Sequence, residues 1–171
     1  AFGIGGAVAN FAGLMHMTMH SLTKSAIFFG VGIITQNAGT KHMDSIRGLT
    51  VSHPALGWAF LVAVLAIAGL PPMGIFMSEF LVVSSAFARE PLLTVPLAFG
   101  LMVGFGALLH RLQGLSFGEP LPLRGHGHPG FALNALALAP MFAHIALVLV
   151  AGLYLPAQLV DWFQRVAGLL G

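Results

Sequence analysis

Residues 7–35 read AVANFAGLMHMTMHSLTKSAIFFGVGIIT, and the only charged side chain in this run is that of Lys24. The hydrocarbon core of a bilayer is about 30 Å thick, and an α-helix needs about 20 mostly apolar residues to cross it. The run exceeds that length, and a QNAG turn at residues 36–39 closes it. We therefore predict a membrane-spanning helix from about Ala7 to Thr35.

The composition of the whole chain points the same way. Only 7% of its 171 residues are charged, against about 25% in an ordinary soluble domain, and 57% are hydrophobic. This excludes a soluble domain. Seven basic against five acidic residues form no basic patch, which excludes nucleic acid as a partner. The absence of cysteine excludes disulfides, thiolate zinc sites and cysteine-ligated iron–sulfur clusters in this chain. We predict an all-α integral membrane protein.

Three further apolar segments reach spanning length, at residues 55–87, 92–117 and 131–155. Residues 157–171 are different, because a helix there has one apolar and one polar face, with Trp162 on the apolar side. That pattern is typical of a helix lying in the membrane interface. We therefore predict a membrane domain over residues 1–156 with about four spans, followed by an amphipathic interfacial helix.

The second segment is too long for one straight span. Residues 55–87 would reach about 50 Å as a continuous helix, against a hydrocarbon core near 30 Å. Pro71 and Pro72 lack two consecutive backbone donors, and a proline disfavours helix at the residue before it. The sequence predicts a discontinuous helix that breaks at this pair.

Basic residues are unevenly distributed between the two sides of the membrane. Those after the first and third spans are Lys41, Arg47, Arg111 and Arg124, and those on the other side are Arg89 and Arg165. Cytoplasmic loops carry an excess of Lys and Arg, so we predict that the first group is cytoplasmic. The chain begins at Ala1 without a signal-peptide pattern, and we expect it to be the C-terminal part of something longer, or a processed product.

His16, His20 and Lys24 follow one another at intervals of four residues and so form a stripe on one side of the first span. A central Lys costs roughly 2.5–3.5 kcal/mol in a bilayer, so Lys24 is expected to face the bundle interior or a wet cavity. A lysine and two histidines can relay protons, which is the interpretation we favour. The alternative is a structural Lys–carboxylate pair. A metal site is disfavoured because a third ligand is missing.

Two other titratable residues in the spans are candidate sites. Glu79 follows the Pro71–Pro72 pair and is either a charge partner and proton carrier or a hydrated residue at the membrane boundary. His110 is either the protonatable end of a buried path or, with Arg111, an interfacial residue. His144 is expected to bond a backbone carbonyl. His126 and His128 are expected to be hydrated.

Several strings resemble one family closely. These are HMTMHSLTKSAIFFGVG at residues 16–32, DSIRGL at 44–49, AGLPPMGIFMSEF at 68–80, FGEP at 117–120 and GLYLP at 152–156. Together they resemble the antiporter-like membrane subunits of respiratory complex I, most closely those of the hydrogenase-4 and formate hydrogenlyase branch. The resemblance covers essentially the whole chain.

The resemblance implies more than the residues do alone. It implies about fourteen helices in two inverted repeats, each with one discontinuous helix, and a buried axis of Lys, His and Glu that carries protons. Lys24 would be the central lysine of the second repeat, with His16 and His20 beside it. The discontinuous helix would be the 92–117 segment, with His110 at a position where the family has Lys or Glu. The Pro71–Pro72 break would then be only a kink.

These observations predict a proton-translocating membrane subunit that moves protons along His16, His20, Lys24, Glu79 and His110. We expect no cofactor or metal in this chain, and redox chemistry in partner subunits of a quinone oxidoreductase or hydrogenase complex. Other expected partners are the missing N-terminal half of the subunit and the lipid of the cell's inner (plasma) membrane. The alternatives are a cation/proton antiporter or inorganic-carbon uptake subunit, and an inert membrane scaffold.

Overall fold

The computed structural model describes residues 1–120 and 135–170, and all regular elements in these ranges are helices. They are α1 (Ala7–Ala38), the short 3₁₀ helix η1 (Met43–Ser45), α2 (Leu49–Ser52), α3 (Pro54–Ile67), α4 (Gly74–Arg89), α5 (Pro91–Ser116), α6 (Ala135–Leu153) and α7 (Ala157–Leu169). The predicted all-α fold is confirmed. The expectations for Arg124, His126, His128 and the first residues of the fourth span fall outside the described residues.

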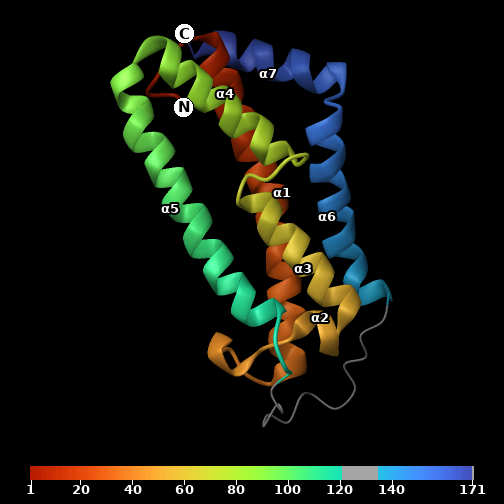
Figure 1. Cartoon of the computed structure of the whole chain (residues 1–171). Helices are drawn as coiled ribbons and strands as arrows, with labels where there is room; N and C mark the ends of the chain where they lie inside the picture. Colours follow the sequence, from red (N-terminus) through yellow and green to blue (C-terminus); the bar gives the residue numbers. More distant parts are fainter. Residues whose placement is uncertain (121–134, 171) are drawn as a thin grey trace.

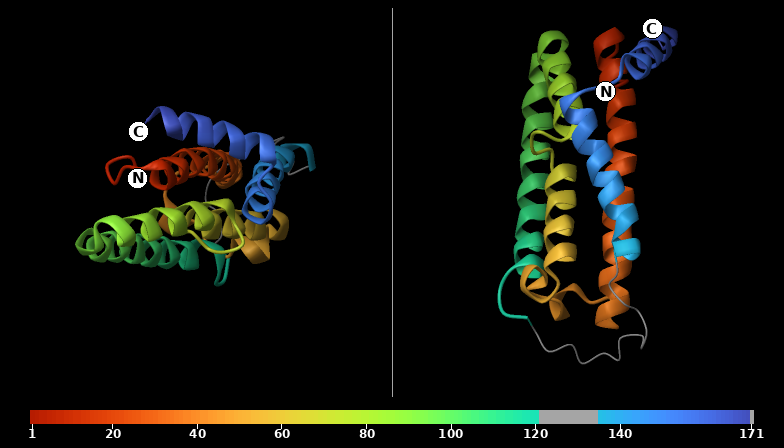
Figure 2. Two further views of the ribbon diagram at one scale, coloured as in Figure 1. Left: turned by 90° about the horizontal axis from the view of Figure 1, so that it is seen from above. Right: turned by 90° about the vertical axis from the view of Figure 1, so that its right-hand side faces the viewer.

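Helix α1 is the centre of the bundle and contacts α3, α4, α6 and α7 (Figure 1). Helices α3 and α4 follow one another end to end along α1, and α5 packs against both of them. Helix α7 crosses the end of the bundle where the two termini lie (Figure 2). One apolar cluster joins α1 to α3 and α6, and a second joins α1 to α4 and α7.

Spans of membrane length account for most of the chain. Helices α1, α5 and α6 are each long and apolar enough to cross a bilayer. Helix α3 has 14 residues and α4 has 16, so each reaches only about 20–25 Å and the two are needed together for one crossing. The prediction of about four spans is confirmed, with the second span made of two helices.

The break in this span lies at the predicted position. Helix α3 ends at Ile67 and α4 begins at Gly74, and the intervening backbone turns through Gly69 at a φ of 77°. A positive φ suits glycine because it has no Cβ. Neither Pro71 nor Pro72 has an N–H to donate, so the helical hydrogen-bond ladder stops here. The predicted discontinuous helix is confirmed.

The implied break in residues 92–117 is not present. Helix α5 is continuous from Pro91 to Ser116, although it contains Pro96 and several glycines. A glycine costs a helix only about 1 kcal/mol, whereas an unsatisfied backbone group in lipid costs several. Glycines alone therefore do not interrupt a span, and a pair of adjacent prolines does. The assignment of the discontinuous helix to this segment was wrong.

The amphipathic character of α7 is also confirmed. Phe163 is fully buried and meets the ring of Phe11 on α1 edge to face, with ring centroids 5.7 Å apart. Trp162 and Leu169 remain exposed. Part of the apolar face of α7 therefore packs against the bundle through Phe163, and the rest of it faces away from the bundle. Its depth in a membrane stays a prediction.

Close packing at the break makes one glycine of α6 critical. A Cβ on Gly152 would overlap the carbonyl oxygen of Pro72 and lie 2.7 Å from the nitrogen of Gly74, and both of these are backbone atoms that cannot move aside cheaply. We expect Gly152→Ala to destabilise the protein by about 1–3 kcal/mol, as overpacking does. The measurement is the thermal stability of the purified full-length protein.

Gly168→Ala is the matched control. Gly168 is also helical, and among the described residues nothing lies within 4 Å of a Cβ placed there. The added methyl group should be neutral or stabilise the helix by up to about 1 kcal/mol. Equal stability of the two variants would contradict the close approach of α6 to the break.

Candidate functional site

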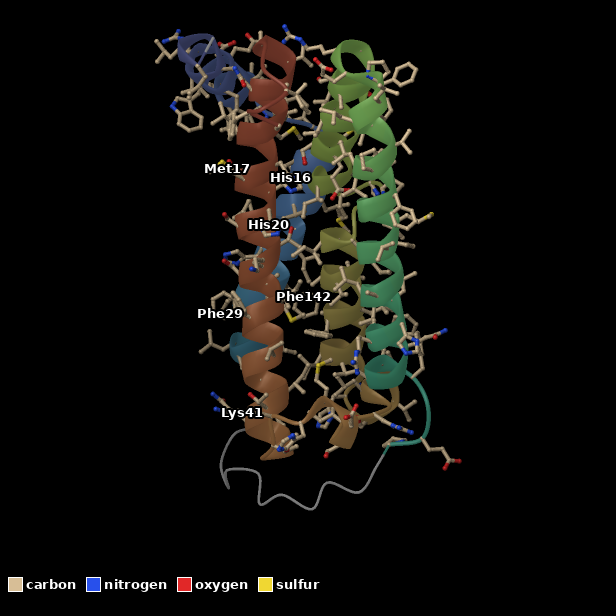
Figure 3. All side chains as sticks on the ribbon, turned by 90° about the vertical axis from the view of Figure 1, so that its left-hand side faces the viewer. His16, Met17, His20, Phe29, Lys41 and Phe142 are labelled. Atoms are coloured by element: carbon tan, nitrogen blue, oxygen red, sulfur yellow. The ribbon has the colours of Figure 1, made fainter. Side chains whose placement is uncertain are left out.

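Two histidines of α1 stack on one another at the level of the break. The ring centroids of His16 and His20 are 5.7 Å apart, with 30° between their planes, and both side chains are half-buried (Figure 3). The spacing of four residues explains this, because it places the second ring one turn above the first. The predicted adjacency of the two imidazoles is confirmed.

Ser78 of α4 anchors His16. The Nδ1 atom of His16 lies 3.0 Å from Ser78 Oγ, and Ser78 donates its hydroxyl hydrogen to the Ile75 carbonyl oxygen at 2.8 Å. Since that hydrogen is already used, Ser78 Oγ accepts from His16 Nδ1–H. The neutral His16 ring therefore carries its hydrogen on Nδ1 and has Nε2 available as a base. Ser78 is fully buried, so the hydrogen bond is shielded from solvent.

A cavity of about 290 Å³ connects His16 with Glu79. Both residues line it, together with apolar side chains that include Val82 of α4 and Leu97 of α5. One water occupies about 30 Å³ of liquid volume, so the cavity has room for several. The structure therefore brings two of the predicted site residues, from two helices, to one space.

The glycine at the break makes room for the Glu79 side chain. Glu79 is half-buried, and a Cβ on Gly69 would overlap its Oε2 atom. The carboxyl group therefore lies directly against the non-helical backbone between α3 and α4. The sequence alone did not identify Ser78 as the hydrogen-bond partner of His16 or Gly69 as the residue that makes room for Glu79. Both residues belong to the AGLPPMGIFMSEF string.

Lys24 does not point into the described part of the bundle. Its side chain is exposed, and Nζ lies 5.8 Å from the centroid of the Phe28 ring. Four residues advance a helix by 400°, so each step turns the stripe by about 40°. His16 faces α4, and Lys24 has turned about 80° away from it. The described residues therefore leave Lys24 exposed, and the expectation that it faces the bundle interior or a wet cavity of the complete subunit stays a prediction.

His110 lies far from the cavity of His16 and Glu79. It is exposed near the carboxyl end of α5, where it lines a second cavity with Asp44, Arg47 and Arg111. Leu101 of α5 lines the first cavity, and nine residues of helix separate it from His110 by roughly 14 Å. The structure does not bring His110 to the other site residues.

His144 makes the bond that the sequence predicts. Its Nδ1 atom lies 2.7 Å from the carbonyl oxygen of Pro140, and its ring packs against Phe29. His144 is therefore a structural residue of α6.

The comparisons with known proteins identify the family. The family model described as "NADH:quinone oxidoreductase/Mrp antiporter, TM" matches residues 1–105. This chain belongs to that family. It is therefore a multi-pass membrane protein of the antiporter-like class, and the resemblance found in the sequence is confirmed.

Individual relatives show which kinds of subunit within the family this chain is similar to. The chain is 59% identical to the hydrogenase-4 component F homolog of Methylacidiphilum infernorum over 170 residues, which are 99% of this chain and 34% of that protein. It is 35% identical to formate hydrogenlyase subunit 3 of Escherichia coli over 75 residues, 44% of this chain and 12% of that one. It is 31% identical to a Na(+)/H(+) antiporter subunit of Alkalihalophilus pseudofirmus over 97 residues, 56% of this chain and 20% of that one.

A solved structure shares the fold. A chain of the Mrp complex from Dietzia sp. superposes with a TM-score of 0.80 and 21% identity, over 98% of this chain and 39% of that one. This chain spans about a third of the length of the Methylacidiphilum infernorum relative.

Proposed function

We propose that this chain is part of a proton-translocating subunit of a membrane-bound nickel–iron hydrogenase or complex I-like complex in the inner (plasma) membrane. The observation that carries the proposal is the cavity shared by Glu79 and His16 at a broken helix. Non-helical backbone at membrane depth is tolerated against protein or a water-filled space, and ionisable residues in membranes mark ion pathways. The similarity to the hydrogenase-4 component F homolog supports the choice of complex.

The chemistry uses groups that can each take and release a proton. Water in the cavity passes a proton between the Glu79 carboxyl group and Nε2 of His16, whose Nδ1–H stays with Ser78. The stacked ring of His20 is the next protonatable group along α1. Two imidazolium charges 5.7 Å apart repel each other, so the histidine pair holds one extra proton at a time.

Lys24 continues the path only if another part of the subunit or a partner covers its exposed side. His110 lines a separate cavity near the carboxyl end of α5 and takes no part in this transfer. Partner subunits supply the redox reaction whose free energy drives the protons, and this chain contributes no redox group to it.

A second candidate is cation/proton exchange. It is favoured by the similarity of this chain to the Na(+)/H(+) antiporter subunit of Alkalihalophilus pseudofirmus. The carboxylate of Glu79 is also a suitable ligand for a small cation.

Ion replacement in proteoliposomes separates the two candidates. The complete complex, reconstituted and supplied with its redox substrates, is expected to move protons at the same rate when choline replaces all Na⁺ and K⁺. Internal pH is followed with a pH-sensitive dye, and redox turnover is followed in parallel. Proton movement that requires Na⁺ or K⁺, or that proceeds by ion exchange without redox turnover, would overturn the proposal in favour of the antiporter.

A further inference from the structure

The carboxyl end of α5 forms a basic cavity with the loop between α1 and α2. The cavity has a volume of about 260 Å³, and its charged lining residues are Asp44, Arg47 and Arg111. His110 and Gln113 also line it and can donate hydrogen bonds. Helix η1 contacts α5 here, and Figure 1 shows the loop that contains η1 beside the lower end of α5.

The two guanidinium groups are available to a ligand. Among residues 1–120 and 135–170, neither Arg47 nor Arg111 has a carboxylate within ion-pair distance, although Asp44 lines the same cavity. Two fixed positive charges against one negative charge leave the cavity positive. Arginine is also the side chain best suited to bind phosphate oxygens in pairs.

An apolar groove between α3 and α5 continues from this cavity. It has a volume of about 580 Å³, with Leu61, Leu65 and Leu109 among its lining residues. His110 and Gln113 line both the cavity and the groove, so the two spaces are adjacent. From Gly106 to Gln113 the groove follows α5 for roughly 10 Å, which is a large part of one leaflet's hydrocarbon depth.

Aromatic residues place this end of the bundle at the membrane boundary. Trp58 of α3 is 53% exposed, and its ring meets that of Phe117 edge to face at 6.3 Å. Phe117 lines the groove and immediately follows α5. Tryptophan is enriched at the level of lipid headgroups, and α5 ends one residue before Phe117.

We propose that this cavity and groove together bind one anionic phospholipid. Its phosphate group lies between Arg47 and Arg111, with Gln113 as a further donor, and an acyl chain lies in the groove between α3 and α5. The combination selects the ligand, because the positive cavity favours a negative headgroup and the adjoining groove requires an apolar chain. Basic pockets between membrane helices are suited to such headgroups. This proposal does not depend on the proton path.

Lipid retention by the purified complex tests the site. The complete complex is washed in detergent with a mixture of phosphatidylglycerol and phosphatidylcholine, and bound lipids are counted by native mass spectrometry. The double variant Arg47→Gln/Arg111→Gln is expected to lose one phosphatidylglycerol per copy of this chain. Its preference for phosphatidylglycerol over phosphatidylcholine should fall about fivefold for each arginine removed.

A matched control removes the same charge elsewhere. Lys41 and Arg165 are both exposed, and neither lines the cavity or the groove. The double variant Lys41→Gln/Arg165→Gln should therefore retain the lipid at the parental level. Equal retention by the two double variants, at either level, would overturn the proposal.

A third variant acts on the groove and leaves every charge in place. Among the described residues nothing lies within 4 Å of a Cβ on Gly106, so the side chain of Gly106→Leu can start without a clash at the Cβ and occupy part of the groove. The Gly106→Leu variant should release the phosphatidylglycerol. Excess inorganic phosphate added to the parental complex should not release it. Full retention by Gly106→Leu would overturn the proposal, and so would displacement by phosphate, since the cavity would then bind a free anion.

Discussion

Replacing Glu79 with glutamine is expected to stop proton movement through the complete complex while leaving its assembly intact. Glutamine keeps the size and hydrogen-bonding ability of the side chain and removes its ability to bind and release a proton. Losing a positioned proton carrier costs about 10²- to 10⁴-fold in rate. The expected result is a fall of at least about a hundredfold in redox-driven proton uptake by proteoliposomes, measured with a pH-sensitive dye.

Two further variants make this result specific. Glu79→Asp keeps the carboxyl group but withdraws it from the cavity by one methylene, so partial activity is expected. Glu90 is the exposed residue that caps the end of α4, outside the cavity of Glu79 and His16, and Glu90→Gln should pump normally. Pumping by Glu79→Gln at the parental rate would show that Glu79 is merely hydrated and would exclude it from the path.

The structure adds the surroundings of Glu79, and the choice between a proton carrier and a hydrated residue stays a prediction. The sequence could not give its depth, because the end of a broken helix can lie at the membrane boundary or within the bundle. In the fold, Glu79 lies against Gly69 at the break and shares a cavity with His16. That placement depends on packing between α1, α4 and α5, which no local pattern encodes.

The break between α3 and α4 could be predicted from the sequence for a local physical reason. Pro71 and Pro72 remove two adjacent donors whatever the surroundings are, so the interruption follows from the backbone alone. The four spans are predictable for a similar reason, since bilayer thickness fixes the number of apolar residues that each needs. The break expected in α5 was carried over from the resemblance, and neither Pro96 nor the glycines of that helix enforce it.

Sequence patterns could not predict the hydrogen bond between His16 and Ser78. It joins residues 62 positions apart in the chain and depends on the close packing of α4 on α1. Gly74 contributes to this packing, since a Cβ there would lie 2.6 Å from the sulfur of Met19. Long-range contacts of this kind fix which histidine nitrogen is basic, and only coordinates reveal them.

We expect redox-driven proton pumping to depend on Lys24 as strongly as on Glu79. Two substitutions distinguish a Lys24 that relays protons from one that only forms a structural ion pair. Lys24→Met removes the charge, and Lys24→Arg keeps it but fixes the proton, because arginine does not release its proton in proteins. If Lys24 relays protons, both variants should lose redox-driven pumping by about 10²- to 10⁴-fold. If it only forms a structural ion pair, Lys24→Arg should pump nearly as well as the parent.

The exposed position of Lys24 makes this comparison informative. The described residues offer it the face of Phe28 and no carboxylate, and a lysine facing lipid would cost roughly 2.5–3.5 kcal/mol. Under the proposed function, we expect a further part of the subunit or a partner subunit to cover this side of α1 with acidic or hydrated groups. Lys41→Arg, at an exposed position beyond the end of α1, is the control and should change neither assembly nor pumping. Full pumping by Lys24→Arg beside an inactive Lys24→Met would remove Lys24 from the relay and leave proton transfer to His16, His20 and Glu79.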